Sequence, residues 1–589
     1  MADKDLTSQE KQRLKEKEKF ERERKKWKQQ ESRKRVQKSG GSKNSLPALL
    51  RIVAVVVAAA VVIGLGSIYA GSYGLPRRYW PALTVGKQTI DVPEWTFTFY
   101  LLYREIYQNS LDSLSYYGFN IYGLETNTSL FEQTKAAEGG GTEPWDVYLR
   151  RQVNTRLQRQ YLLYSEAQKA GYQLPAKELE ALDKAIASLK AEARSNAMSP
   201  NAYLRNSYTA GLTQRKYSRL QEREQVVQGF SQKKLKEFLA NHPDEELLSI
   251  YDEDKGLYDQ VDYRVYSVAK VKLDIGPDEA MEALEARQAA ADAEAKQEAN
   301  DLLRGGTQES FIAAVQAYDR ALYDEAHQHE EDEEVDHEHN YTYDAESATL
   351  NLRRRREYIE NTYRDEDFTA WVFSAARAAG DSTVLETDSA FYAIYMVQPP
   401  YAQATVDFYA IEVPVGEHEH EDGEEHSDDE ASPQELAQQK ADELLARWEA
   451  DGGTLEAFAA LAAAQPDPIE REEGAQPGLI DDIAPGDFTE FDSWLFGPER
   501  KAGDTTVIEG GGSYIVLYMA SQNEDRFAWQ KEIGNTLAQE DFEAYVLETR
   551  EQYPLGYHGI GMRYAMKEAQ RLCDTWMIHA ANYGGYSYY

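Results

Sequence analysis

Cysteine is almost absent from this sequence, because Cys573 is the only one among 589 residues. A single thiol excludes a disulfide framework and any zinc or iron–sulfur site built from several cysteines. Basic residues are outnumbered as well, since 64 Lys and Arg stand against 102 Asp and Glu, and the formal net charge is −38. Phosphate backbones are repelled by such a chain, so we expect no nucleic acid among its partners.

Motifs that mark common enzyme classes are also missing. The sequence has no GxSxG, no HExxH, no P-loop and no GxGxxG after a strand. We therefore expect no cofactor. Hydrophobic residues nevertheless make up 42% of the chain, which is enough for packed cores. The length suits about three or four domains.

The charges are unevenly distributed along the chain. Residues 1–51 carry a net charge of +9, so the remaining residues carry −47. We predict a basic cytoplasmic arm over residues 1–47. Residues 52–76 contain no charged side chain, and the apolar run predicts a transmembrane anchor over residues 48–72.

A cleaved signal peptide is the alternative interpretation of that apolar run. The basic segment before it is far longer than the usual charged region of a signal peptide, which favours an uncleaved anchor. The side rich in Lys and Arg stays in the cytoplasm. We therefore expect a single-pass protein of the cell membrane, with its N-terminus cytoplasmic and most of the chain extracytoplasmic. The near absence of cysteine suits a bacterial surface.

Short-range patterns predict several elements in residues 80–260. Val85 and Ile90 around Gly86 predict a strand and turn, and a helix is expected to begin near Pro93. Residues 108–142 are rich in tyrosine, glycine and asparagine, and we expect a long loop there. Apolar residues spaced by three and four predict three further helices, beginning near 145, near 176 and at Pro200.

The second half of the chain contains a repeat. The segment WVFSAARAAGDSTVLETDSAFYAIYM from Trp371 aligns without gaps to WLFGPERKAGDTTVIEGGGSYIVLYM from Trp494, and 11 of the 26 positions are identical. Similar predicted strands begin at Val261 and Val406. We therefore predict an α+β unit present twice, each with a strand, helices, a WxF helix end, a turn at AGD and two strands.

These segments together resemble a known family. Residues 80–260, with the YLRNSYTAGLTQRKY segment, are similar to the helical chaperone domain of SurA/PrsA-type foldases. Residues 261–400, with an acidic His-rich insertion, and residues 404–521 each resemble a parvulin-type peptidyl-prolyl isomerase domain through AGDSTVLE and AGDTTVIE. Residues 525–589 would form a C-terminal helix and tail, which the resemblance places against residues 145–225.

The resemblance predicts an α+β multidomain fold with one N-terminal transmembrane helix, a helical chaperone domain, two parvulin-like domains and C-terminal helices. It also predicts weak or absent isomerase activity. Active parvulins carry histidines where this sequence has Val265 and Tyr392 in the first unit, and Ala410 and Ile515 in the second. Asp467, before a proline, is the one match to the acidic catalytic position, and a simple turn residue is the alternative.

Two acidic runs concentrate most of the histidines. Imidazole and carboxylate both bind zinc, copper or nickel, so these histidines are candidate ligands of weak metal binding, although no spacing defines a closed site. They are His327, His329, His337, His339, His418, His420 and His426. We expect solvated loops at both runs and no dedicated metal.

The sequence therefore predicts a membrane-anchored extracytoplasmic chaperone, or foldase, for secreted proteins. Its expected partners are unfolded secreted polypeptides, the membrane and the secretion machinery. Tyr103, Tyr107, Tyr148 and Tyr164 are candidate client contacts, although each could equally be a core residue. An active peptidyl-prolyl cis-trans isomerase is one alternative, and an envelope scaffold or metal-binding surface protein is another.

Overall fold

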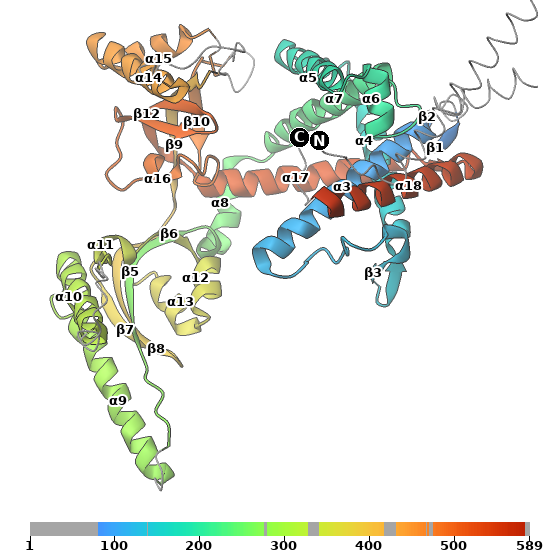
Figure 1. The fold of residues 1–589 in the computed structure, drawn as a ribbon. Coiled ribbons are helices and arrows are strands. Elements are labelled where there is room, and N and C mark those ends of the chain that lie inside the picture. The colour runs from blue at the N-terminus through green and yellow to red at the C-terminus, as the bar shows by residue number, and fades with distance from the viewer. Residues whose placement is uncertain are drawn as a thin grey trace, which may run out of the picture.

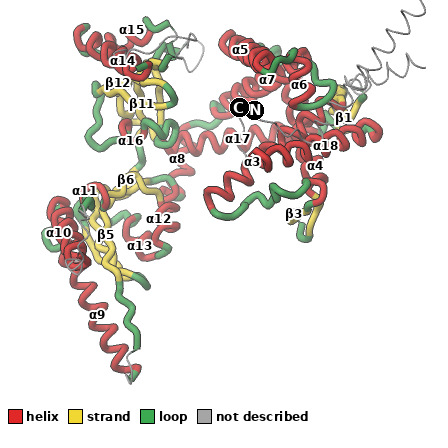
Figure 2. The backbone as a smooth tube through the Cα atoms, viewed as in Figure 1, coloured by secondary structure: helices red, strands yellow, loops and turns green. Residues whose placement is uncertain are grey.

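The computed structural model of this chain is an α+β structure of helices and small antiparallel sheets (Figures 1 and 2). It describes residues 80–137, 139–275, 280–327, 341–416, 432–466, 468–469 and 475–583. The strands form one three-stranded sheet, one two-stranded hairpin and two four-stranded sheets.

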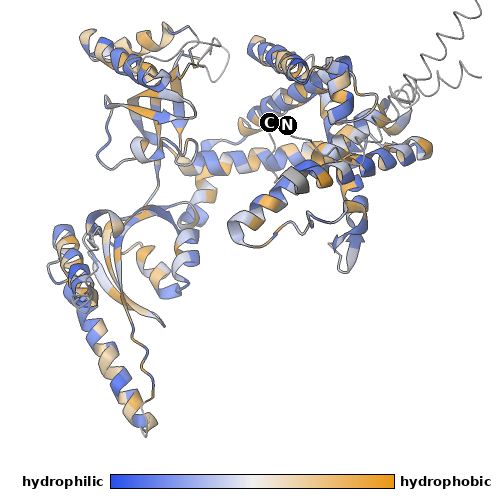
Figure 3. Ribbon diagram, viewed as in Figure 1, coloured by the Kyte–Doolittle hydropathy of each residue, from blue (hydrophilic) through white to orange (hydrophobic). Residues whose placement is uncertain are grey.

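The predicted fold class is wrong in one element, the transmembrane helix. In the described part of the chain, every helix is too short or too polar to cross a membrane. Figure 3 agrees, since the helices carry hydrophilic residues along their lengths. The residues predicted as arm and anchor, 1–47 and 48–72, lie outside the described residues. The fold is therefore α+β without a membrane-spanning element among its described helices.

The helical body combines residues from both ends of the described chain. Its first part contains β1 Pro81–Val85, β2 Gln88–Asp91, α3 Val92–Tyr117, β3 Thr134–Ala136, β4 Thr142–Pro144, α4 Trp145–Lys169, α5 Ala176–Ser195, α6 Pro200–Ser207, α7 Gln214–Leu239 and α8 Asp244–Glu253. Its last part contains α17 Ala528–Arg550, β13 Leu555–Tyr557 and α18 Gly559–Tyr583.

Local capping explains where several of these elements begin. The Asp91 side chain caps α3 by accepting a hydrogen bond from the Glu94 N–H at 3.1 Å, and Ser199 caps α6 before Pro200. Both helix starts were predicted, as was the turn at Gly86. The expected loop over residues 108–142 is wrong at both ends. Helix α3 continues to Tyr117 and ends at Gly118, which has φ +75°, and β3 pairs with β4 as a hairpin.

The C-terminal helices return to the body and complete it. Helix α17 packs against α4, α7 and α8, and Arg159 Nη1 lies 2.6 Å from Glu543 Oε2. This position agrees with the packing expected against residues 145–225. Strand β13 pairs with β1, and α18 packs along α3. Residues 525–589 were expected to form a C-terminal helix and a tail, but the bounds of α18 were not predicted. One hydrophobic core joins α3 and α4 to α17 and α18.

The two α+β units have equivalent topology. The first contains β5 Gln260–Ala269, α9 Met281–Leu302, α10 Gln308–His327, α11 Ala345–Ala348, β6 Leu350–Arg355, α12 Arg356–Tyr363, α13 Glu366–Val372, β7 Ser382–Glu386 and β8 Ala390–Tyr401. The second contains β9 Ala404–Pro414, α14 Pro433–Ala450, α15 Leu455–Ala463, β10 Leu479–Ile483, α16 Asp492–Leu495, β11 Thr505–Gly510 and β12 Ser513–Phe527. Their strand orders, β6-β5-β8-β7 and β10-β9-β12-β11, correspond strand by strand.

The predicted repeat fits these elements, with one strand added. The AGD turns are confirmed, since Gly380 and Gly503 both have positive φ, at 91° and 95°. Strands β6 and β10, each second in its unit, were not predicted. Each sheet has helices on both faces. In the first unit α9 and α10 cover one face and α12 and α13 the other, whereas α14 and α15 lie opposite α16 in the second.

In both units an aspartate on the central strand accepts a hydrogen bond from the backbone of the added strand, β6 or β10. We call this contact the carboxylate clamp. Arg353 in β6 and Asp482 in β10 each have φ +54°, at a register shift in their pairing with the central strand. Their N–H groups donate to Asp262 Oδ1 at 2.6 Å and to Asp407 Oδ1 at 2.7 Å. The clamp therefore satisfies a backbone donor that the irregular ladder leaves unpaired.

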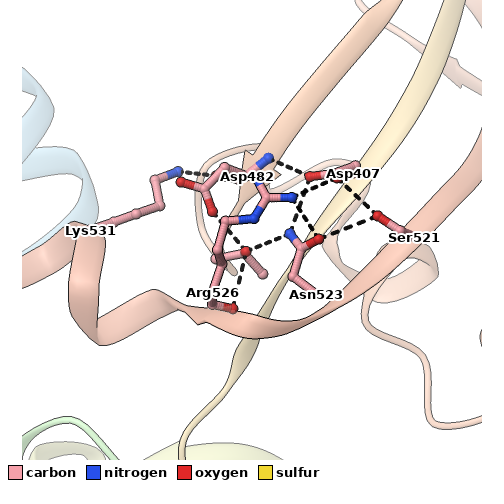
Figure 4. A network of polar contacts seen from close by, with 7 residues as sticks. Asp407, Asp482, Ser521, Asn523, Arg526 and Lys531 are labelled. Carbon is pink, nitrogen blue, oxygen red and sulfur yellow. Dashed lines mark hydrogen bonds and ion pairs between the residues drawn. The ribbon is translucent and has the colours of Figure 1, made fainter. Parts of the chain in front are cut away.

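In the second unit this clamp extends into a polar network that reaches α17 (Figure 4). Asp407 Oδ2 accepts hydrogen bonds from Ser521 Oγ at 2.9 Å and from Arg526 Nη2 at 2.8 Å, and Asn523 Nδ2 donates to Oδ1 at 3.2 Å. Burial of Asp407 favours its neutral form, but the hydrogen bonds outweigh that effect and hold the pKa of Asp407 below its ordinary value.

Asp407→Asn is expected to destabilise the second unit by about 1–3 kcal/mol at neutral pH, because an amide cannot accept all four hydrogen bonds. Since the folded-state pKa is lowered, the carboxylate's contribution is present above its unfolded pKa of about 3.9 and is lost as pH falls through the folded value. Thermal unfolding at pH 7 and near pH 3 measures both effects. Asp525→Asn, at an exposed position in the neighbouring strand β12, is the control, and an equal shift in both variants would contradict the assignment.

Candidate functional site

The strongest candidate site is an open groove in the helical body, with a volume of about 760 Å³. It lies where α3, α5, α6 and α18 meet the start of α7. Helical spacing explains its composition, because residues 100, 104, 107, 108 and 111 of α3 share one face, and so do residues 572, 575, 576, 579 and 580 of α18. The face of α3 and the face of α18 both line the groove.

Aromatic rings form most of the groove wall. The ring centroid of Tyr100 lies 6.3 Å from that of Tyr208 and 6.4 Å from that of Trp576, both in edge-to-face geometry. Phe97, which is buried, supports this wall from beneath with its ring 5.1 Å from Tyr208 and 6.1 Å from Tyr217. Edge-to-face contacts fix the ring orientations, so the wall is largely preformed.

Charged side chains lie among these rings. The Arg104 guanidinium is 4.1 Å from the ring centroid of Trp576 and 5.8 Å from that of Tyr100. Arg571 and Glu192 also line the groove. Burial raises the pKa of Tyr100 to about 12 and also raises the pKa of Tyr217. These phenols are therefore neutral at physiological pH and act as amphipathic surfaces.

This arrangement is suited to binding by contact with rings. Tyr and Trp offer large contact areas at a low cost in conformational entropy, and each keeps a polar group for hydrogen bonding. A cation over an aromatic face adds a further attractive contact for a ring or carboxylate that enters. An open groove of this kind can hold aliphatic and aromatic side chains of an extended polypeptide.

The four tyrosines predicted as client contacts lie in different environments. Tyr107 lines the groove, and its hydroxyl donates to the Thr126 carbonyl at 3.1 Å. Tyr103 is only 2% exposed and belongs to the core. Tyr148 lies beneath Lys135, whose Nζ is 3.5 Å from its ring centroid, and Tyr164 is half-buried; both lie away from the groove lining.

The groove residues that α18 contributes were not predicted from the sequence. Leu572, Trp576 and Ala580 recur every four residues, and Thr575 and His579 add neighbouring positions. That spacing is a helical signal. It identifies a helix but not the helix it packs against, so the groove itself could not be found in this way.

Positions where the resemblance places histidines hold packed apolar side chains. In the first unit Val265 and Tyr392 face the cluster formed with α12 and α13, and the Tyr392 ring lies 5.4 Å from Tyr363 and 5.7 Å from Phe368. In the second unit Ala410 and Ile515 belong to the cluster formed with α16. Asp467 lies outside the described residues.

The described residues contain no metal-binding site. His327 is the last residue of α10, and the other six candidate histidines, at 329, 337, 339, 418, 420 and 426, lie outside the described residues. Among described side chains, no three His, Cys, Asp or Glu are arranged to hold a metal ion. Burial raises the pKa of the Cys573 thiol, so this cysteine is not a reactive nucleophile.

Comparisons with known proteins complete the description of the site. Neither the known protein families nor the curated proteins include a match to this chain, so the case for its function rests on the groove.

Proposed function

We propose that this protein is a chaperone that holds unfolded polypeptides, with the groove between α3 and α18 as its client-binding site. The observation that carries the proposal is the preformed wall of Tyr100, Tyr208 and Trp576 around an open cavity of about 760 Å³. Unfolded chains expose the side chains that native proteins bury. Aromatic walls bind such side chains without requiring one sequence.

The proposed clients are secreted polypeptides, and the proposed location is the extracytoplasmic side of the cell membrane. The sequence of residues 1–72 is the support for this location, because a basic segment precedes an uncharged apolar one. Secretion machinery is a further proposed partner, since it delivers unfolded chains to that side. The net charge of −38 favours solubility when apolar clients are bound.

The two α+β units are proposed to act as weak or inactive isomerases that contribute surface and spacing. Four positions support this part of the proposal, namely Val265, Tyr392, Ala410 and Ile515, where apolar packing occupies the places of the expected histidines. Prolyl isomerisation has a barrier of about 20 kcal/mol. In place of the expected histidine pairs, these cores contain Val265, Ala410 and Ile515, with Tyr392 as the one phenol among the four positions.

Client holding is tested with the purified full-length chain and a proline-poor substrate that aggregates on dilution from denaturant. Tyr208→Ala combined with Trp576→Ala should raise the chaperone concentration needed for half-protection by about tenfold, since two rings contribute about 1.4 kcal/mol or more together. Tyr358→Ala, which removes a 40% exposed ring on α12, is the matched control and should leave protection unchanged. Light scattering follows aggregation, and thermal unfolding checks that each variant is folded.

The same preparation, with a chelator present, separates the proposal from its enzymatic alternative. Refolding of a proline-limited substrate should proceed at the uncatalysed rate. Acceleration that disappears in Asp467→Ala would instead identify an active isomerase. Absence of protection by the unmodified chain, or equal loss in the groove and control variants, would contradict the chaperone proposal.

A further inference from the structure

A second cavity, with a volume of about 710 Å³, is lined by several arginines, although the chain as a whole is strongly acidic. It lies between α4, the end of α17, β13 and the start of α18. Its lining includes four arginines and no aspartate or glutamate, and the four are Arg150, Arg151, Arg550 and Arg563. Like charges gathered at one cavity are costly unless an anion compensates them.

The charge of this cavity is only partly compensated within the described part of the protein. Arg151 forms a two-pronged ion pair with Glu143, with both N···O distances at 2.9 Å, and Arg550 Nε donates to Gln158 Oε1 at 2.7 Å. Arg150 and Arg563 have no ion pair with any described residue. Two guanidinium groups are therefore available to an anion, and their planar donor geometry matches phosphate and carboxylate.

The start of α18 adds to this positive potential. The helix spans Gly559–Tyr583, its first turn contains no acidic residue, and Gly559 and Met562 line the cavity beside Arg563. The N-terminal end of a 25-residue helix carries partial positive charge and unpaired N–H groups. The helix terminus and the arginines therefore both favour an anionic ligand.

Apolar residues form a further part of the lining, beside Asn154, Thr155 and Tyr557, and they restrict the ligand further. Val147, Leu555, Met562 and Met566 contribute an aliphatic and thioether surface. A bare inorganic anion would leave that surface in contact with water. An anion joined to an apolar group would use both parts of the cavity.

The cavity also lies next to the point where the described chain begins. The Trp80 ring is 4.7 Å from that of Tyr564, the residue after Arg563, and β13 pairs with β1. Figure 1 shows β1 beside one end of α18. Residues 52–76, shortly before Trp80, are the longest uncharged stretch in the sequence. The arginine cavity therefore lies beside Trp80, where the described chain begins, and the uncharged stretch precedes that point in the sequence.

We propose that this cavity binds the phosphodiester headgroup of an anionic phospholipid. The phosphate would lie between Arg150 and Arg563 at the start of α18, and the glycerol and first methylenes would contact Met562 and Met566. This site is separate from the groove, so the proposal does not depend on client binding. It would hold one end of the helical body at a lipid surface.

The test uses the full-length chain in a nonionic detergent and titration calorimetry with three soluble probes. Dihexanoyl phosphatidylglycerol should bind saturably, and dihexanoyl phosphatidylcholine should bind at least about tenfold more weakly, because its headgroup has no net charge. Glycerol 3-phosphate should also bind more weakly, since it lacks the apolar part. Equal binding of glycerol 3-phosphate would indicate a site for soluble phosphate esters and would overturn the lipid assignment.

The matched variants separate this cavity from general charge effects. Arg150→Gln with Arg563→Gln should weaken phosphatidylglycerol binding by about tenfold or more. Arg447→Gln, at a surface arginine on α14 that is 66% exposed, removes a charge elsewhere and should leave binding unchanged. If the double variant does not fold, the exposed Arg563→Gln alone is used. Equal affinity for the two lipids, no binding of any probe, or equal loss in the control would overturn the proposal.

Discussion

Replacing Glu94 by alanine should destabilise the helical body by about 3–5 kcal/mol, because it leaves a buried arginine without its counter-charge. Glu94 on α3 is 6% exposed. Its Oε1 accepts a hydrogen bond from Arg223 Nη2 on α7 at 2.5 Å and another from Tyr161 Oη on α4 at 2.8 Å. Arg223 is 9% exposed, and its guanidinium lies 4.1 Å from the Tyr161 ring centroid.

An exposed ion pair between α3 and α4 provides the control. Glu105 and Arg156 are 3.3 Å apart, but their side chains are 57% and 54% exposed. Glu105→Ala should therefore cost no more than about 1 kcal/mol. Hydrogen exchange of amides in α3, α4 and α7 measures both changes locally, which avoids assuming that this multidomain chain unfolds in one step.

Removing both charges tests whether the unpaired arginine causes the loss of stability in Glu94→Ala. In Glu94→Leu with Arg223→Met no buried charge is left unpaired, so much of the lost stability should return. A double variant as unstable as Glu94→Ala would show that packing rather than the charge pair dominates. Because α3 carries Tyr100 and α7 carries Tyr217, Glu94→Ala should also reduce client holding, in step with the fraction of molecules whose helical body is open.

Local signals in the sequence were sufficient for elements that local chemistry determines. The Asp91 cap with the following proline, the Ser199 cap of α6 and the glycines of the AGD turns each specify their own backbone conformation. Alignment of the repeat from Trp371 with that from Trp494 then placed equivalent strands in both units. These features require no information about what packs against them.

Elements defined by distant partners could not be predicted in the same way. Strand β13 is three residues long and exists because it pairs with β1, about 470 residues earlier in the chain; Thr84 Oγ1 donates to the Gly556 carbonyl across this pair. Strand β6 ends in three consecutive arginines, which conceal the alternation of a half-buried strand. A helical stripe likewise does not guarantee burial, since Leu179 on α5 is 48% exposed.

Both candidate sites have the same limitation, because each is assembled by tertiary packing. The groove combines Tyr100 with Trp576, and the arginine cavity combines Arg150 with Arg563. Periodicity identifies the apolar face of α3 but does not indicate that a C-terminal helix lies along it. Docking of α18 is therefore the structural event on which both proposed activities depend.

Gly561→Ala should disrupt that docking. A Cβ atom added at Gly561 would lie 1.8 Å from the Pro81 carbonyl oxygen and 2.7 Å from its carbonyl carbon. These are backbone atoms of β1, so they cannot move aside as a flexible side chain could. Helix propensity alone would stabilise the variant by roughly 1 kcal/mol, but separating α18 from β1 should cost about 1–3 kcal/mol or more. Thermal unfolding should therefore show net destabilisation.

Gly559→Ala is the matched control in the same helical turn, because a Cβ atom there would have no neighbour within 4 Å. It should leave the unfolding temperature unchanged or slightly raised. Gly561→Ala should also weaken client holding and phosphatidylglycerol binding together. Trp576→Ala should weaken only client holding, and Arg563→Gln should weaken only phosphatidylglycerol binding. If Gly561→Ala altered one activity and spared the other, α18 could not be the shared support of the two sites, and each would then have to be held in place by the helices on its own side of the body.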